Sequence, residues 1–224
     1  MAAFVAWWRL AGVDALVARH PRPWGQTLGP PSPAPRPAAP PARPRARFAT
    51  LEELRAHVRS AGPRVPLADG NPAAGLVVVG EAPSAADLET GRPFSGPAGQ
   101  LLDRMLAAIG RDRGSAYLTL LCPRLPHPGP PPDDAIAADL ALTLEHLRLV
   151  APRAVLVLGA IPARSLLGRS EPIAALRGTW CELDLGDVRV PALPTFNPAY
   201  LLRRPDAKRA AWADLLALKA RLGG

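Results

Sequence analysis

Two short apolar runs constrain the fold of this chain more than any other feature. They are LVVV at residues 76–79 and AVLVL at residues 154–158, and a glycine follows each of them. Uninterrupted apolar runs of this length are typical of strands that are buried on both faces of a sheet. Because helix-like segments lie between and around them, we predict an α/β fold: a three-layer α/β/α sandwich around a short, mostly parallel central sheet.

The remaining segments complete this sandwich. Thr50 and Glu53 have the spacing of a capping box that opens a helix, and Asp133 with Asp134 is placed to cap a long helix. Helices are predicted at 51–60, 96–109, 133–150, just after 159 and at 206–222, with further strands at 117–121, 179–184 and 188–195. In such sheets ligands bind beyond the carboxyl ends of the strands. Function is therefore expected in the segments that follow predicted strands, at 80–84, 122–132 and 195–204.

The chain divides into three parts by composition. Residues 1–20 have the apolar spacing of a helix, residues 21–49 are crowded with proline, alanine and arginine, and residues 50–224 hold the predicted domain. A proline-rich segment of this kind cannot bury a core and favours extended conformers. The net charge is +8, but residues 50–224 hold only twenty basic against eighteen acidic side chains. The basic linker is either a plain spacer or a weak contact with nucleic acid or a partner protein.

The cysteine count and the apolar segments bound the class of protein. Cys122 and Cys181 lie far apart in the sequence, which predicts a reducing compartment and argues against a disulfide framework or a local zinc site. Arg9 and Asp14 interrupt the apolar stretch at 2–19, which is too short to cross a bilayer. We expect a cytoplasmic monomer with no membrane contact, no bound metal and no signal peptide.

An ordered set of motifs resembles the family 4 uracil-DNA glycosylases over about residues 50–222. The matching segments are GEAP (80–83), GRPF (91–94), GPAGQLLD (96–103), YLT (117–119), LGA (158–160), LLG (166–168), LRG (176–178) and PAYLLR (198–203). The resemblance implies an enzyme that flips a uracil out of DNA and hydrolyses its glycosidic bond, leaving an abasic site.

The resemblance also implies roles for individual residues. Phe94 would stack under the flipped base, and the carboxylate of Asp87 would position water or stabilise the cationic sugar. The alternatives are a core aromatic and a solvated loop acid. Gly80, Glu81 and Ala82 would bind the base, and the expected contacts with DNA come from Pro83, Ser84, Leu201, Leu202, Arg203 and Lys208. The two leucines would enter the duplex as a wedge, unless they belong to an ordinary junction between loop and helix.

Several positions depart from the family pattern. Leu120 stands where the family has an Asn that reads the uracil edge, and Asn197 stands where it has a His that donates to the uracil oxygen. A leucine offers no hydrogen bond, whereas an asparagine amide still donates one. Ser84 replaces the usual Gly.

The family's 4Fe–4S cluster needs about four thiolates. Arg124 and Asp139 occupy two of the cluster positions, so we expect no cofactor. His127 lies in the neighbouring loop and is an alternative donor to Asn197.

Three functions remain open at this point. The first is a DNA-repair glycosylase with weakened or altered base specificity. The second is a catalytically impaired protein of the same fold that binds DNA or a partner. The third is an unrelated α/β nucleotide binder, against which stands the absence of a glycine-rich phosphate loop: GEAPS matches neither GxGxxG nor GxxxxGK(S/T).

Overall fold

The computed structural model describes residues 48–61, 67–123 and 132–223. The predicted helix at 1–20, nearly all of the linker at 21–49, and both Arg124 and His127 lie outside these ranges. Within them, no helix combines the length and the apolar character that crossing a membrane requires.

Six strands form one mixed sheet in the order β1-β3-β2-β4-β6-β5. They are β1 (Ala68–Gly70), β2 (Leu76–Gly80), β3 (Tyr117–Leu120), β4 (Ala154–Leu158), β5 (Cys181–Asp184) and β6 (Arg189–Thr195). The four inner strands are parallel, and each edge strand pairs antiparallel with its neighbour. The two runs that constrained the prediction are β2 and β4, and all five residues of each are buried.

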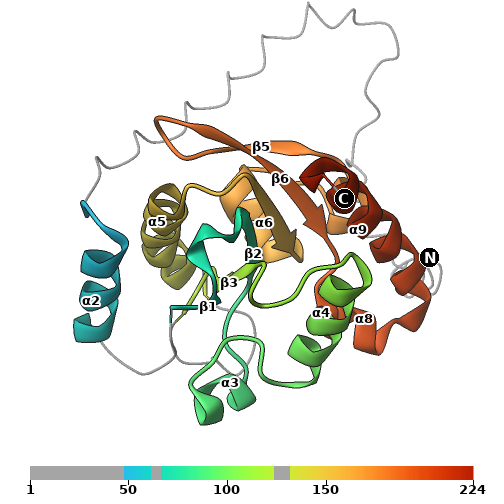
Figure 1. Ribbon diagram of the computed structural model, residues 1–224, viewed down its shortest axis with the longest axis horizontal. Coiled ribbons are helices and arrows are strands. Elements are labelled where there is room, and N and C mark those ends of the chain that lie inside the picture. The colour runs from blue at the N-terminus through green and yellow to red at the C-terminus, as the bar shows by residue number, and fades with distance from the viewer. Residues whose placement is uncertain (1–47, 62–66, 124–131, 224) are drawn as a thin grey trace, which may run out of the picture. The chain divides into compact units, whose positions relative to one another are not determined.

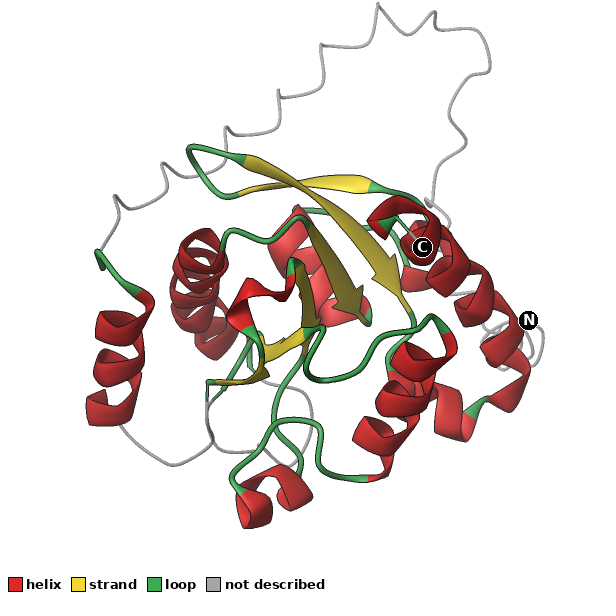
Figure 2. Cartoon of the chain, viewed as in Figure 1, coloured by secondary structure: helices red, strands yellow, loops and turns green. Residues whose placement is uncertain are grey.

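Helices cover both faces of this sheet (Figures 1 and 2). Alternate strand residues such as Val78 and Leu156 pack with α4 (Pro97–Ala108), α8 (Pro198–Arg203) and α9 (Lys208–Leu222). The residues between them, such as Val77 and Val155, pack with α5 (Asp133–Val150), α6 (Ala160–Leu167) and α7 (Ile173–Leu176), and α2 (Leu51–Ala61) lies against α5. The predicted three-layer sandwich with a mostly parallel sheet is confirmed.

Four short elements were not predicted: β1, α3 (Ala85–Thr90), α7 and α8. Each spans six residues or fewer, too short to show a helical or strand period in the sequence. The same is true of the two 3-10 turns, η1 (Pro72–Ala74) and η2 (Pro205–Ala207). Local caps hold three of these elements: Asn71 at η1, Ser84 at α3 and Asn197 at α8.

Of the two predicted caps, the one at Thr50 forms with a change and the one at Asp133 and Asp134 does not form. The Thr50 hydroxyl accepts from the Glu53 amide at 3.2 Å, but the Glu53 carboxylate accepts from the amide of Ala49 at 2.8 Å, one residue earlier than in a standard capping box. Asp133 and Asp134 lie in the first turn of α5, and Pro132 takes the cap position. Their charge still favours the helix start, where the backbone N–H groups are unpaired.

A buried polar chain links α2, β3 and α5 on the far side of the sheet from α4. Arg55 donates to the Tyr117 hydroxyl at 3.1 Å, and that hydroxyl lies 3.0 Å from Nε2 of His146. His146 is 1% exposed. Burial, with a smaller contribution from the charge of Arg55, lowers the pKa of His146 to about 3.

This histidine should make stability depend on pH. Its folded pKa of about 3 lies below its unfolded value near 6.5, so the unfolded chain binds the extra proton. The stabilisation is complete above about pH 6.5 and falls by about 1.4 kcal/mol per unit as the pH drops below that. Urea unfolding between pH 7.5 and pH 5 measures the slope. His146→Gln should flatten it, whereas a change at the exposed His57 should leave it as in the wild type; equal slopes in all three proteins would contradict the assignment.

Candidate active site

A pocket of about 400 Å³ opens at the carboxyl ends of β2, β4 and β6. The connection after β2 leads to β3 on one side, and the connection after the adjacent strand β4 leads to β5 on the other side, so the two connections leave in opposite directions. Such a switch point is where open α/β sheets bind ligands. The pocket is lined by Glu81, Ala82, Pro83, Gly159, Ala160, Ile173, Phe196, Asn197, Ala199, Tyr200 and Arg203.

Asn197 occupies the pocket through its place at the start of α8. It is the N-cap of that helix, and its Oδ1 accepts from the amide of Ala199 at 2.8 Å. The cap uses the acceptor of the side-chain amide, which leaves Nδ2 as a donor on the pocket side. Gly159 makes room for this arrangement: it has a φ of +99°, and a Cβ there would lie 3.2 Å from the Cβ of Asn197.

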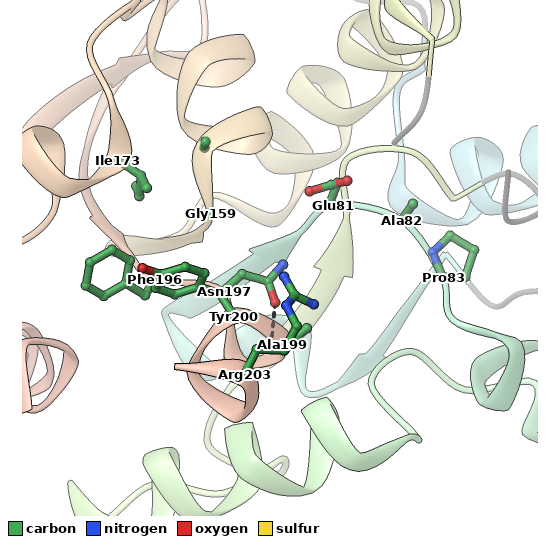
Figure 3. Close-up of a pocket in the computed structure, with 11 residues that line it drawn as sticks. Glu81, Ala82, Pro83, Gly159, Ile173, Phe196, Asn197, Ala199, Tyr200 and Arg203 are labelled. Carbon is green, nitrogen blue, oxygen red and sulfur yellow. Dashed lines mark hydrogen bonds between the residues drawn. The ribbon is translucent and has the colours of Figure 1, made fainter. Parts of the chain in front are cut away.

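The pocket has a polar centre and two apolar ends (Figure 3). Glu81, Asn197 and Arg203 lie between Ala82 and Pro83 at one end and the aromatic rings at the other. Burial raises the pKa of Glu81 above its usual value. The Arg203 side chain is exposed at the rim.

Two aromatic rings form the other end of the pocket. Phe196 and Tyr200 lie with their ring centroids 5.1 Å apart, and Arg177 stacks over Phe196 at 5.6 Å from its centroid. Phe196 is 8% exposed and belongs to the core as well as to the pocket. The wall is therefore tied to the sheet and does not depend on a loop.

Gly80, Phe94 and Leu120 form a separate cluster beside this pocket and do not line it. Gly80 and Leu120 are register partners at the ends of β2 and β3. A Cβ on Gly80 would lie 2.5 Å from Cζ of Phe94 and 3.0 Å from Cδ2 of Leu120. The ring of Phe94 thus packs directly on the backbone at the end of β2, and Leu120 is 1% exposed.

Asp87 lies in the first turn of α3, with both carboxylate oxygens engaged. One accepts from the amide of Ser84 at 2.7 Å and the other from the amide of Ser95 at 2.6 Å. Ser84 in turn caps α3 and completes a capping box with Asp87. Asp87 is 3% exposed, so the alternative of a solvated loop acid is wrong. The carboxylate joins Ser84, the residue after the GEAP segment, to Ser95, the residue after Phe94.

The two leucines of the expected wedge have different environments. Leu201 is 1% exposed and packs in the core, whereas Leu202 is 41% exposed. In this conformation Leu201 has no access to a duplex, because its side chain lies on the inward face of α8 and fills space in the core. Only Leu202 stays available for insertion. Arg203 and Lys208 are exposed nearby, at the end of α8 and the start of α9.

The sequence prediction therefore found part of the pocket and missed the rest. It named Glu81, Ala82, Pro83, Asn197 and Arg203, which the structure brings together. It assigned no site role to Gly159, Ile173, Phe196 or Tyr200. The LGA motif at the end of β4 was a usable signal for Gly159. The ring pair lies in the segment 195–204 where function was expected, and Tyr200 belongs to the PAYLLR motif. Neither ring was singled out, because aromatic residues beside a strand are most often core residues.

The residues present do not suit an iron–sulfur cluster. Cys122 is buried after β3, and Cys181 lies on the edge strand β5. Asp139, at one expected cluster position, is a buried carboxylate on α5, and carboxylates are not the ligands of such clusters. In the described part of the chain, no three His, Cys, Asp or Glu side chains are grouped as metal ligands would be.

Comparison with known proteins places this architecture in a family. Residues 67–216 match the model of the uracil DNA glycosylase superfamily. The chain is 33% identical to a type-4 uracil-DNA glycosylase of Pyrobaculum aerophilum over 66% of its own length and 78% of that protein. It is 34% identical to the type-4 enzyme of Thermotoga maritima over 62% of its length and 72% of that protein. The chain therefore belongs to the uracil-DNA glycosylase superfamily.

Proposed function

We propose that residues 50–224 form a DNA-repair glycosylase that hydrolyses the N-glycosidic bond of a flipped, deaminated base, uracil or a related one, and leaves an abasic site. The observation that carries this proposal is the position of Asn197. Its cap bond to Ala199 uses the amide oxygen and leaves Nδ2 as the remaining donor in the pocket that Glu81, Ala82 and Pro83 also line. A fixed donor of this kind stabilises the negative charge that the departing base gains as the bond breaks.

The proposal assigns the rest of the site by its placement. Phe94 supplies the stacking surface beside Gly80, and Ala82 and Pro83 supply backbone against which DNA lies. Glu81 serves as the polar group at the pocket centre. Leu120 places an apolar side chain where the related family reads the uracil edge, so discrimination between bases should be weaker than in a site with a polar reader there.

A panel of oligonucleotides tests the activity. Uracil, hypoxanthine and xanthine are placed in single and double strands, and base release is measured for the wild type and for Asn197→Asp. This substitution keeps an acceptor for the Ala199 amide but removes the donor, and we expect a fall of about 10²–10³ in rate. Leu120→Asn and Asn197→His, alone and together, should raise uracil release above the other bases. Release by no variant on any base would end the proposal.

Leu202 and Leu201 make a matched pair for the wedge. Leu202→Ala should slow release from double-stranded DNA on the order of tenfold, because insertion of an apolar side chain offsets the cost of unstacking. Release from single strands should not change. Leu201→Ala should instead lower the free energy of unfolding by about 2–5 kcal/mol, as for a buried core leucine. Equal losses on both kinds of DNA for Leu202→Ala would argue against a wedge.

One observation favours a second candidate, a DNA-binding protein of this fold with impaired catalysis. Asp87 is engaged by two backbone amides and is 3% exposed, so its carboxylate holds the loop and is not aimed at water in the pocket. Lesion-independent, salt-sensitive DNA binding without base release, under the same conditions as the panel, would support this candidate.

A further inference from the structure

The backbone at Phe94 adopts a conformation that needs support. Its φ is +57°, in the left-handed region that bulky residues rarely occupy. A residue held there is strained, so the surrounding contacts must enforce the conformation. With the backbone in this conformation, the Phe94 ring lies against Gly80 at the end of β2.

Arg113, in the loop between α4 and β3, supplies that support. Its Nη2 donates to the carbonyl of Phe94 at 2.6 Å, and its Nη1 donates to the carbonyl of Pro93 at 3.0 Å. The guanidinium therefore holds the two consecutive carbonyls that set the direction of the Phe94 peptide. A planar group with fixed donors can span both at once, which a lysine ammonium cannot reproduce.

Two carboxylates hold the guanidinium in this position. Nε and Nη2 donate to Asp103 of α4 at 2.8 and 3.3 Å, and Nη1 donates to Asp69 of β1 at 2.6 Å. Although burial alone would raise it, hydrogen bonds from Arg113 and Arg92 lower the pKa of Asp69 below its usual value. The three donor nitrogens of Arg113 thus join a strand, a helix and the Phe94 loop.

The other side of the same loop is held independently. The amide of Ser95 donates to Asp87 at 2.6 Å. Gly99 lies so close that a Cβ on it would be 1.6 Å from the Phe94 carbonyl oxygen, which lets α4 pack on this peptide. Phe94 therefore has its peptide groups fixed before and after the residue, and its ring direction follows from them.

We propose that Arg113 is a positioning residue that sets the orientation of the Phe94 ring for stacking on a flipped base. The orientation of the Phe94 ring by Arg113 does not depend on the proposed glycosylase function. The expected effect on base release does rest on that function. Arg113 does not line the pocket, so it acts on a substrate only through Phe94.

Fluorine NMR tests the geometry without any activity. The chain has four phenylalanines, so uniform labelling with para-fluorophenylalanine gives a simple spectrum. The resonance that is missing from the spectrum of Phe94→Leu is that of Phe94. Arg113→Met should shift and broaden the Phe94 signal. Arg113→Lys should do so in part, and Asp103→Asn, which weakens the hold of α4 on the guanidinium, should do so as well. If Arg113→Met does not fold, Arg113→Lys and Asp103→Asn still test whether the guanidinium orients the Phe94 ring.

Arg148→Met is the matched control. Arg148 is 25% exposed against 22% for Arg113, it donates to the carboxylate of Glu145, and it also holds a phenylalanine carbonyl, that of Phe48. This variant should disturb the Phe48 signal and leave the Phe94 signal as in the wild type. A Phe94 resonance that is unchanged in folded Arg113→Met and Arg113→Lys would overturn the proposal.

A double-mutant cycle tests the consequence. Arg113→Met should lower kcat/KM for base release on the order of tenfold to a hundredfold, as small misplacements of binding groups do. In a Phe94→Ala background the same change should cost less than about twofold, since the group through which it acts is gone. Equal losses in both backgrounds would overturn the proposal. A moved Phe94 resonance with no base release by any variant would leave Arg113 as the positioning residue and refute the glycosylase function.

Discussion

Replacing Asp214 by alanine is expected to lower the free energy of unfolding by about 3–5 kcal/mol, because it leaves a largely buried guanidinium without its partner. Asp214 of α9 is 1% exposed. Arg177 donates to both of its oxygens, with Nε at 2.9 Å, and the Thr195 hydroxyl donates to it at 2.6 Å. Arg177 also donates to the carbonyl of Ala210. The Thr195 hydroxyl, the other side-chain acceptor in this network, is a single neutral oxygen and cannot replace both carboxylate oxygens.

The loss should also reach the pocket. Thr195 ends β6 one residue before Phe196, and Arg177 stacks on the Phe196 ring. Asp214→Ala should therefore weaken base release further than its stability alone explains at a temperature where the variant is folded. Thermal or urea unfolding measures the first effect and the oligonucleotide assay the second.

Asp206→Ala is the control for this prediction. Asp206 also pairs with an arginine, Arg204, but its side chain is 67% exposed. An exposed pair contributes little to stability because solvent screens it, so this variant should unfold close to the wild type. Joint replacement by Arg177→Met and Asp214→Leu should recover much of the lost stability, because apolar side chains of similar volume carry no unpaired charge. Equal effects of Asp206→Ala and Asp214→Ala would contradict the assignment.

Gly99→Ala is expected to be the most damaging single-methyl change in the described part of the chain, with a loss of about 3 kcal/mol or more. Its Cβ would lie 1.6 Å from the carbonyl oxygen of Phe94 and 2.8 Å from its Cα. Overpacking against side chains costs about 1–3 kcal/mol, and backbone that is already held in a strained conformation cannot move aside as a side chain does. Chemical unfolding measures the loss.

Gly168→Ala separates this clash from the general effect of removing a glycine. Gly168 caps the end of α6 with a φ of +63°, and nothing lies within 4 Å of the Cβ it would gain. Its replacement should cost about 1 kcal/mol, the penalty of a left-handed conformation alone. If Gly99→Ala cost no more than Gly168→Ala, then α4 and the Phe94 loop would not be packed as tightly as the structure has them.

The longer elements could be predicted from local sequence. LVVV and AVLVL are buried strands because no polar side chain interrupts them, and α5 and α9 are long runs rich in alanine and leucine that contain no proline or glycine. The short β1 could not be predicted, since the sequence ADG has little strand propensity and is ordered by pairing with β3.

The site divides in the same way. The sequence alone determined the fold class, the family resemblance and the strand-end segments that hold Glu81 and Asn197, because these depend on contiguous residues. Which leucine of the pair is buried depended on the rotation of α8 against the core, and only the tertiary structure decided it. The same holds for Arg113 with Asp69 and Asp103, and for Arg177 with Asp214. The chain has twenty-seven basic and nineteen acidic side chains, and the local sequence does not indicate which of them pair. Only folding brings these partners together.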